Sequence, residues 1–239
     1  MRAFDIASAS VTTLLRGGLG MRVAQVGARP AKPLQVYEFE GCPFCRKVRE
    51  ALTMLDLEAE IRPCPKGGKR FRSVLAEIGG KAQFPYLVDP NTGTSLYESG
   101  DIVDYLFAHY GEGAAPAALR AGPIATLAVV ASGLGRGRAG TFVRPSKAPA
   151  KALELYSFEA SPFCRLVREV LCELELPYRL LNVAKGSARR DAFRAHAGKV
   201  QVPYLIDPNT EIEMFESADI IAYLESTYGL ESTYGLEST

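Results

Sequence analysis

The stretch LQVYEFEGCPFCRKVRE at residues 34–50 recurs as LELYSFEASPFCRLVRE at residues 153–169. Each copy begins with alternating apolar and polar residues, which is typical of a strand, and changes to helical spacing after its proline. Proline in the first turn of a helix sacrifices no backbone hydrogen bond, so both helices are predicted to begin there. A strand that leads through a short turn into an amphipathic helix, twice, indicates an α/β protein made of two similar units.

The repeat continues through the rest of each unit. QFPYLVDPNTG at residues 83–93 matches QVPYLIDPNT at 201–210, and LYESGDIVDYL at 96–106 matches MFESADIIAYL at 214–224. The pattern predicts the order βαβαββα for each unit. In the first unit we expect strands at 34–39, 57–62, 85–89 and 94–97, a helix after Pro43, and helices at 69–78 and 101–110, the last of them capped by Ser99.

We expect the repeat to divide the 239 residues into five segments. These are a helical lead-in at 1–33, a first domain at 34–112, a helical linker at 113–152, a second domain at 153–229 and a low-complexity tail at 230–239. The lead-in ARPAKPL before the first domain resembles KAPAKAL before the second, so both lead-ins are predicted to be structural, packed on their own unit or between the two.

Composition narrows the class of protein. A net charge of +1 gives no general reason to expect nucleic acid as a partner, and the longest apolar run, residues 124–131, is too short to span a bilayer. Five cysteines, two of them in one CxxC, favour a reducing compartment. No metal is expected, because no second CxxC follows and neither histidine has ligand spacing.

The first CxxC predicts thiol chemistry. Cys42 is expected just before a helix, whose N-terminus stabilises a thiolate, so Cys42 should be an exposed nucleophile with a lowered pKa. Cys45, one turn inside, could then attack a mixed disulfide on Cys42. The second unit has Ser161 in place of the nucleophile and retains Cys164, expected to be partly buried. Of the remaining thiols, Cys64 is either a third redox group or a bystander, and Cys172 is expected in the core.

Three motifs in each unit carry a resemblance to a known family. CPFC, the turns FPY and VPY, and the pairs Glu-Ser resemble the active sites of glutaredoxins and of the glutathione-transferase N-terminal domain, within the thioredoxin superfamily. The whole chain resembles tandem proteins of plants and green algae. The resemblance implies two tandem thioredoxin-like domains, a plastid location (otherwise the cytoplasm) and glutathione as cofactor. It assigns glutathione to cis-proline turns at Phe84-Pro85 and Val202-Pro203, γ-glutamyl ligands Glu98, Ser99, Glu216 and Ser217, and glycyl ligands Lys66, Gln83, Lys185 and Gln201.

Three functions fit these residues. The first is a glutathione-linked oxidoreductase that acts through Cys42 on disulfide or glutathionylated substrates. The second is a glutathione transferase that uses Ser161, with Cys42 secondary, and the third is a non-enzymatic scaffold that binds glutathione or protein. Transferases form the electrophile pocket with a large helical domain after the first, and we expect none here because about 40 residues separate the units and few follow the second. This favours the oxidoreductase.

Overall fold

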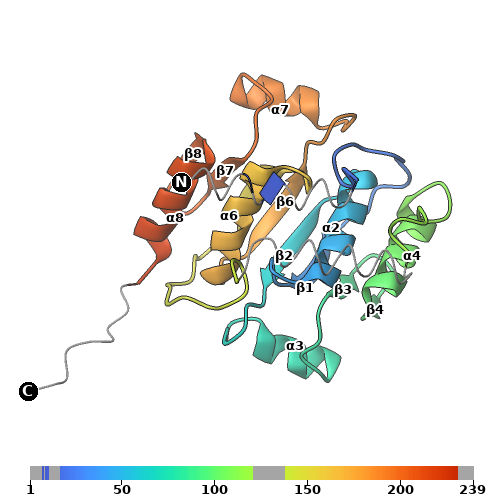
Figure 1. Cartoon of the computed structure of the whole chain (residues 1–239), viewed down its shortest axis with the longest axis horizontal. Helices are drawn as coiled ribbons and strands as arrows, with labels where there is room; N and C mark the ends of the chain where they lie inside the picture. The colour runs from blue at the N-terminus through green and yellow to red at the C-terminus, as the bar shows by residue number, and fades with distance from the viewer. Residues whose placement is uncertain (1–6, 8, 11–16, 121–137, 231–239) are drawn as a thin grey trace, which may run out of the picture.

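The computed structural model describes residues 7, 9–10, 17–120 and 138–230 (Figure 1). The first unit contains β1 (Leu34–Glu38), α2 (Pro43–Met54), β2 (Ala59–Pro63), α3 (Arg72–Gly79), β3 (Tyr86–Asp89), β4 (Thr94–Leu96) and α4 (Ser99–Tyr110). The second contains β5 (Leu153–Ser157), α6 (Pro162–Glu173), β6 (Tyr178–Asn182), α7 (Arg190–Ala197), β7 (Tyr204–Asp207), β8 (Ile212–Phe215) and α8 (Ser217–Tyr228). The order βαβαββα predicted for each unit is therefore seen twice.

The two units share one mixed sheet, with the strand order β4-β3-β1-β2-β6-β5-β7-β8. The units meet at β2 and β6, which pair antiparallel with Ala59 opposite Leu180 and Ile61 opposite Tyr178. These pairs exchange when the units are interchanged, so the chain has an approximate twofold axis through this strand pair. We call the boundary along β2 and β6, and between helices α2 and α6, the seam. Independent folding of each unit, at the boundaries given above, stays a prediction.

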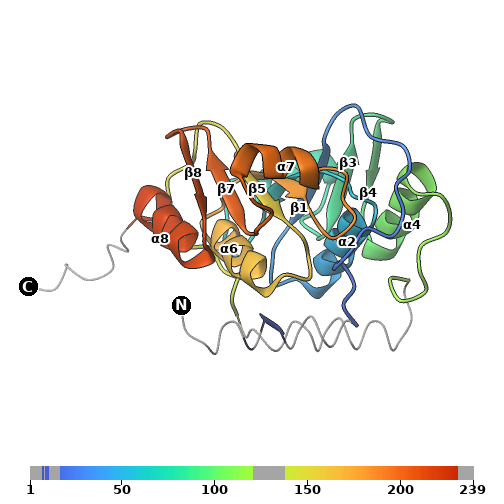
Figure 2. The same ribbon diagram turned by 90° about the horizontal axis from the view of Figure 1, so that it is seen from above.

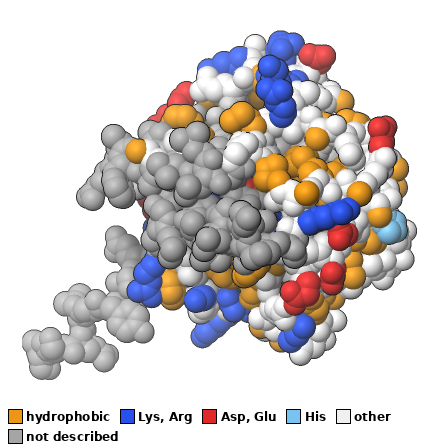
Figure 3. All heavy atoms as spheres, turned by 45° about the vertical axis from the view of Figure 1, so that its right-hand side comes forward, with side chains coloured by type: hydrophobic (Ala, Val, Ile, Leu, Met, Phe, Trp, Pro, Cys, Tyr) orange, Lys and Arg blue, Asp and Glu red, His pale blue; other side chains and the backbone are white. Residues whose placement is uncertain are grey.

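The helices form a layer on each face of the sheet. Figure 2 shows α7 on one face, with α2, α4, α6 and α8 together on the other. The side toward α4 carries interspersed acidic, basic and apolar side chains, with neither charge sign gathered among the described residues in view (Figure 3). No helix in the described ranges combines the length and apolar character needed to cross a bilayer.

Helix α2 buries two faces rather than one. The predicted core face is confirmed, since Val48, Ala51, Leu52 and Leu55 are all inaccessible, and each large apolar side chain contributes roughly 1.5–3 kcal/mol. The charged residues between them, Arg46, Lys47, Arg49 and Glu50, were expected off this face but are also buried. Arg46 and Arg49 reach Glu159 across the seam, and α6 has Arg165, Arg168 and Glu169 at the matching positions, with Leu166 in place of Lys47.

Two predicted helix starts are displaced. Helix α3 begins at Arg72 rather than at residue 69, because the N–H groups of Lys69 and Arg70 donate to the carboxylate of Glu175 in the second unit. Helix α4 begins at Ser99 itself, so the N-cap is Glu98 and no side chain caps the helix. The expectation that Ser99 is the cap was wrong by one residue.

The lead-ins cross the seam. We name residues 18–23 the first strap and residues 138–143 the second strap. The first strap pairs with the second unit, where Val23 N donates to Lys185 O (2.9 Å) and Ala160 N to Gly20 O (3.2 Å). The second strap pairs with the first unit, where Gly41 N donates to Gly140 O (3.0 Å). After each strap the chain returns to its own unit, so the lead-ins pack between the units, one of the two arrangements predicted.

The described parts of the lead-ins are turns and extended chain, apart from helical Ala7, Ala9 and Ser10. Residues 17–33 and 138–152 are thus not the helices expected. Gly20 and Gly140 have positive φ (75° and 67°), and a Cβ on either would stand 2.8 Å from the Cβ of Glu159 or Glu40, which excludes a helix at these close crossings. Residues 113–120 form no helix either, and the remaining predictions, for 1–6, 8, 11–16 and 121–137 and for the tail after residue 230, fall outside the described residues.

Candidate active site around Cys42

Cys42 is the N-cap of α2, as predicted. Its sulfur accepts the N–H of Cys45 at 3.4 Å. The pKa of Cys42 is lowered, first by a hydrogen bond from the Cys45 thiol and then by the backbone N–H groups of Cys45 and Phe44, while burial opposes the shift. Only 5% of Cys42 is exposed, so the expectation of an exposed nucleophile was wrong.

Cys45 has the opposite electrostatics. It is fully buried, and burial raises its pKa well above the usual range, assisted by the hydrogen bond that it donates to Cys42. A pair of thiols with opposed pKa shifts holds one proton on the inner sulfur and leaves the outer sulfur as the thiolate. The opposed shifts therefore favour the thiolate on Cys42 and the thiol on Cys45.

The cis-proline turn lies beside the loop that carries Cys42. The Phe84-Pro85 peptide is cis, as the resemblance implied. The Phe84 ring meets Phe39, three residues before Cys42, edge to face with the centroids 5.9 Å apart. The guanidinium of Arg72 lies 4.6 Å above the same ring. The contacts of Phe84 with Phe39 and Arg72 thus place the cis-proline turn beside the loop that leads to Cys42.

Glu98 and Gln83 form one polar group. Glu98 has a positive φ (62°), which is uncommon for a residue other than glycine, and its carboxylate accepts a hydrogen bond from the Gln83 amide. Glu98 is exposed, whereas Ser99 is buried. The sequence assigned Gln83 to the opposite, glycyl end of glutathione. In the structure the Gln83 amide donates to Glu98, and the assignment of Gln83 and Lys66 to the glycyl end stays a prediction.

The second strap borders this site, which sequence reasoning missed. Lys66 N donates to Thr141 O (2.7 Å) and Val143 N donates to Lys66 O (3.0 Å). The strap runs so close to residue 41 that a Cβ there would overlap Thr141 Oγ1, and only a shift of the Thr141 side chain would make room for it. The repeated lead-in was the available signal, but the sequence pattern does not say which unit a lead-in contacts.

The second unit repeats the arrangement without the nucleophile. Ser161 is the N-cap of α6, and its Oγ accepts the N–H of Cys164 at 3.3 Å. Burial raises the pKa of Cys164, which is wholly inaccessible rather than partly buried. The other counterparts keep their places: Val202-Pro203 is cis, Glu216 with positive φ accepts a hydrogen bond from Gln201, and Ser217 is buried.

Comparison with known proteins follows the same repeat. Residues 36–114 and 155–232 each match the family model described as glutathione S-transferase, N-terminal domain, and together they exceed half of the sequence. The chain belongs to this family. A curated relative, the glutathione S-transferase-like protein tpcF of Aspergillus fumigatus, is 35% identical over 79 residues, which are 33% of this chain and 34% of the relative. The chain thus spans about a third of the length of that relative.

Two solved glutathione transferases are distantly similar. The Bombyx mori transferase BmGSTD1 has 24% identity and a TM-score of 0.32, with 36% of this chain and 39% of that chain covered. Leishmania TDR1, a trimeric glutathione transferase, has 12% identity and a TM-score of 0.31, with 87% of this chain and 70% of that chain covered.

The remaining thiols of this family member are buried. Cys64 follows β2, at the same sheet end as Cys42 as expected, and its N–H donates to Glu38 O at 2.6 Å. Burial raises the pKa of Cys64, and it packs among Tyr37, Leu75 and Tyr86. Cys172 lies in the interior, as predicted, and its sulfur accepts the N–H of Glu40 at 3.3 Å. Among the residues that the structure describes, no group of three His, Cys, Asp or Glu side chains could hold a metal.

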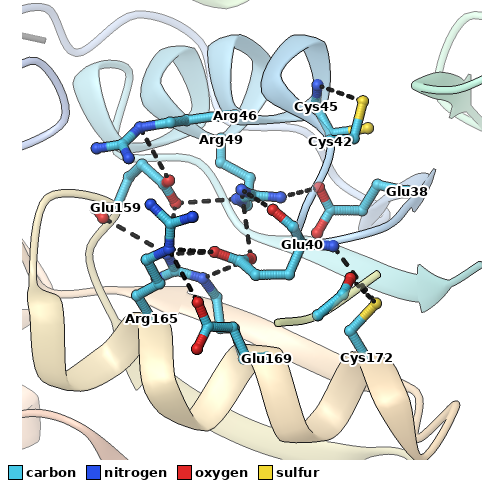
Figure 4. A network of polar contacts seen from close by, with 12 residues as sticks. Glu38, Glu40, Cys42, Cys45, Arg46, Arg49, Glu159, Arg165, Glu169 and Cys172 are labelled. Carbon is cyan, nitrogen blue, oxygen red and sulfur yellow. Dashed lines mark hydrogen bonds and ion pairs between the residues drawn. The ribbon is translucent and has the colours of Figure 1, made fainter. Parts of the chain in front are cut away.

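A buried ion cluster fills the seam next to Cys42 (Figure 4). Arg49 Nε lies 2.9 Å from Glu159 Oε2, and its twofold counterpart Arg168 Nε lies 3.1 Å from Glu40 Oε2. Each arginine also contacts the glutamate of its own unit, at 3.3 Å for Arg49 with Glu40 and 2.9 Å for Arg168 with Glu159. The two arginines hold the pKa of Glu159 at about 2, against the effect of burial. Ion pairs between the units, Arg49 with Glu159 and Arg168 with Glu40, thus stabilise part of the buried charge of each unit.

Glu38 breaks the symmetry of this cluster. Arg49 donates to the carboxylate of Glu38, whereas Arg168 donates to the hydroxyl of Ser157, the counterpart of Glu38, at 3.2 Å. Burial raises the pKa of Glu38 to about 7, although Arg49 opposes the shift. The ion pairs of the cluster involve four guanidinium groups and five carboxyl groups, those of Glu38, Glu40, Glu50, Glu159 and Glu169, and a buried carboxyl in excess favours its protonated form. The one signal in the sequence was this Glu-for-Ser difference within the repeat.

Proposed function

We propose that this chain is a glutathione-linked thiol–disulfide oxidoreductase with Cys42 as its nucleophile. The observation that carries the proposal is the opposed pKa shifts of Cys42 and Cys45 at the start of α2. The thiolate is the reactive form of cysteine, and its neighbour keeps a proton. Membership of the glutathione S-transferase N-terminal domain family supports glutathione as the ligand.

The reaction has two steps, and glutathione is the reductant. The Cys42 thiolate attacks the glutathione sulfur of a glutathionylated substrate, the disulfide bond breaks, and the substrate sulfur leaves as a thiolate that takes up a proton. This leaves glutathione bound to Cys42 by a disulfide. A second glutathione thiolate then attacks the glutathione sulfur, which returns Cys42 as a thiolate and releases oxidised glutathione. Cys45 offers an alternative second step by attacking Cys42, which releases reduced glutathione and forms the Cys42–Cys45 disulfide.

The charges around the site fit glutathione in one direction. Glu98 offers a carboxylate to the ammonium of the γ-glutamyl residue, and Gln83 orients that carboxylate. The backbone of Phe84 can pair with the cysteinyl residue as an added strand. Lys66, on the loop after β2, is the residue that we assign to the glycyl carboxylate. The resulting orientation brings the glutathione sulfur to the start of α2.

The second unit has a supporting part in this proposal. Ser161 cannot exchange disulfides, because its hydroxyl does not ionise near neutral pH, and Cys164 is buried with a raised pKa. The unit nevertheless supplies Glu159 and Arg168 to the seam beside Cys42. We infer that the second unit positions the first, whether or not it also binds glutathione.

The test is reduction of a glutathionylated peptide by glutathione. We expect Cys42→Ser to abolish activity above the uncatalysed rate and the matched Cys164→Ser to retain most of it. Ser161→Cys should add activity if the second glutathione site is intact. Full activity of Cys42→Ser would assign the chemistry to the second unit. Conjugation of a small electrophile by the Cys42→Ser protein, lost on Ser161→Ala, would instead make the chain a conjugating transferase.

A further inference from the structure

The second strap belongs to the surroundings of Cys42, although the second unit follows it in the sequence. Its carbonyl at Gly140 accepts the N–H of Gly41, the residue before Cys42. Its residues 141 and 143 make hydrogen bonds on both sides of Lys66. Side chains on this strap are therefore held beside the thiolate by backbone bonds, and they do not come from the unit that carries it.

Two cationic side chains, those of Arg138 and Lys66, lie against the ring of Phe142 in the second strap. Phe142 is 38% exposed. The guanidinium carbon of Arg138 lies 4.2 Å from the centroid of its ring, and Lys66 Nζ lies 5.8 Å from it. Cation–π contacts of this kind fix the long side chains of Arg and Lys at a modest gain in free energy. Lys66 is the residue expected to reach the glycyl carboxylate, and Arg138 shares its ring.

Charged side chains of both signs belong to the proposed glutathione site. Glu98 supplies a carboxylate at one end. Arg72 lies over Phe84 and donates to the carbonyls of Cys64 and Pro65, just before Lys66, and Lys66 shares the Phe142 ring with Arg138. Glutathione carries an ammonium and a carboxylate at the γ-glutamyl end, and a carboxylate without a neighbouring ammonium at the glycyl end. The strap side thus has more positive charge than Lys66 alone provides.

We propose that Arg138 and Phe142 of the second strap complete the glutathione site around Cys42, with Arg138 as a partner of the glycyl carboxylate. A guanidinium pairs with a carboxylate through two parallel hydrogen bonds, which a lysine cannot make. The inference rests on the proposed function, because it assigns a further ligand to the same site. It makes substrate recognition by the first unit depend on the lead-in of the second.

The first strap provides a matched control. It places Arg22 next to Lys185 of the second unit, the counterpart of Lys66, and Val23 N donates to Lys185 O. Arg22 occupies the strap position that corresponds to Phe142, so the second unit has a strap cation without the ring. A change at Arg22 removes an exposed positive charge from an equivalent strap while it leaves the surroundings of Cys42 intact.

The experiment measures how fast the Cys42 thiol is lost to three disulfides: oxidised glutathione, the disulfide of glutathione glycine amide, and hydroxyethyl disulfide. In each case the Cys42 thiolate attacks one sulfur, the S–S bond breaks and the other half leaves as a thiolate. We expect Arg138→Gln to slow the reaction with oxidised glutathione by about 5- to 10-fold, the effect of one partly exposed charge-assisted pair. Rates with the other two disulfides should stay within about twofold, because those disulfides lack the carboxylate.

Controls separate binding from structure. Arg22→Gln should react like the wild type with all three disulfides, and Arg138→Lys should recover part of the lost rate. Equal slowing of Arg138→Gln with all three disulfides would show a structural effect on Cys42 and overturn the inference, as would no slowing at all. A wild type that reacts no faster with oxidised glutathione than with hydroxyethyl disulfide would overturn the proposed function itself, which is a distinguishable result.

Discussion

Arg49 reaches from the first unit to Glu159 of the second, with Nε 2.9 Å from Oε2, and both side chains are almost wholly buried. The same guanidinium contacts Glu38 and Glu40. A buried arginine with three carboxyl partners is costly to remove, since Glu38, Glu40 and Glu159 each lose one of the buried guanidinium contacts that stabilise them.

We therefore expect Arg49→Ala to lower the free energy of unfolding by about 3–5 kcal/mol. Denaturant titration followed by circular dichroism measures the change. The matched control is Arg120→Ala, which removes an exposed arginine 3.8 Å from Asp104 and should cost less than about 1 kcal/mol. Equal losses for the two variants would mean that the seam cluster contributes no more than a surface pair.

The raised pKa of Glu38 predicts that stability falls as pH rises through a defined window. The folded protein keeps the Glu38 proton up to a pKa of about 7, whereas the unfolded chain loses it near 4.5. The folded state thus binds more protons between these values, and the stabilising contribution of this group is lost as pH rises from 4.5 to 7. Glu159, with its pKa of about 2, acts in the separate window below 4.5 and with the opposite sign.

The measurement is the free energy of unfolding of the wild type and of Glu38→Gln at pH 5 and at pH 7.5. Glutamine keeps the shape and cannot titrate, so the variant should lose less stability between the two values, by roughly 1–3 kcal/mol. Identical losses in the two proteins would show that Glu38 is ionised throughout.

Cys42 should be the first thiol to react with an alkylating reagent. Its pKa is lowered, while burial raises the pKa values of the other four cysteines, Cys45, Cys64, Cys164 and Cys172. With a limiting dose of iodoacetamide near neutral pH, peptide mapping should find label on Cys42 before any other site. The denatured protein should label all five without preference, and early label elsewhere in the folded protein would contradict the assignment of the nucleophile.

Cys45 should matter more as a hydrogen-bond donor than as a second redox thiol. Its raised pKa disfavours the thiolate needed to attack a mixed disulfide. We expect Cys45→Ser to keep about half or more of the glutathione-dependent activity, because the hydroxyl still donates to Cys42, and Cys45→Ala to react several-fold more slowly through a higher Cys42 pKa. The pH profile of Cys42 alkylation measures that pKa. A loss in Cys45→Ser as complete as in Cys42→Ser would instead make the dithiol step obligatory.

The local sequence pattern predicted those parts of the fold that depend on contacts within one unit. Alternation identified β1, and the spacing of Val48, Leu52 and Leu55 identified the core face of α2, because these residues meet the sheet of their own unit. The same periodicity could not show that Arg49 is buried. Its partner Glu159 lies 110 residues away in the sequence, and only the pairing of β2 with β6 brings the two together.

The same distinction between local patterns and contacts across the seam applies to the predictions for the candidate site. Cys42, Phe84-Pro85 and Glu98 were predicted because each motif lies within one unit and carries its own local geometry. Gln83 donates a hydrogen bond to Glu98, which sequence spacing did not indicate, and its assignment to the glycyl end of glutathione stays a prediction. Arg138 and Phe142 were missed because nothing in a lead-in sequence says that its strap crosses to the other unit.

The crossed straps give this chain the form of a dimer with exchanged N-terminal arms, whose two subunits are joined end to end. A cut between residues 120 and 138 would leave two fragments, each carrying the arm that its partner needs. Fusion fixes the partners at a ratio of one to one. Because the units are fused, one copy can lack the nucleophile and still support the other copy through its strap and its residues in the seam. With Ser161 in one copy and Cys42 in the other, the chain resembles a heterodimer whose two subunits are fused into one polypeptide.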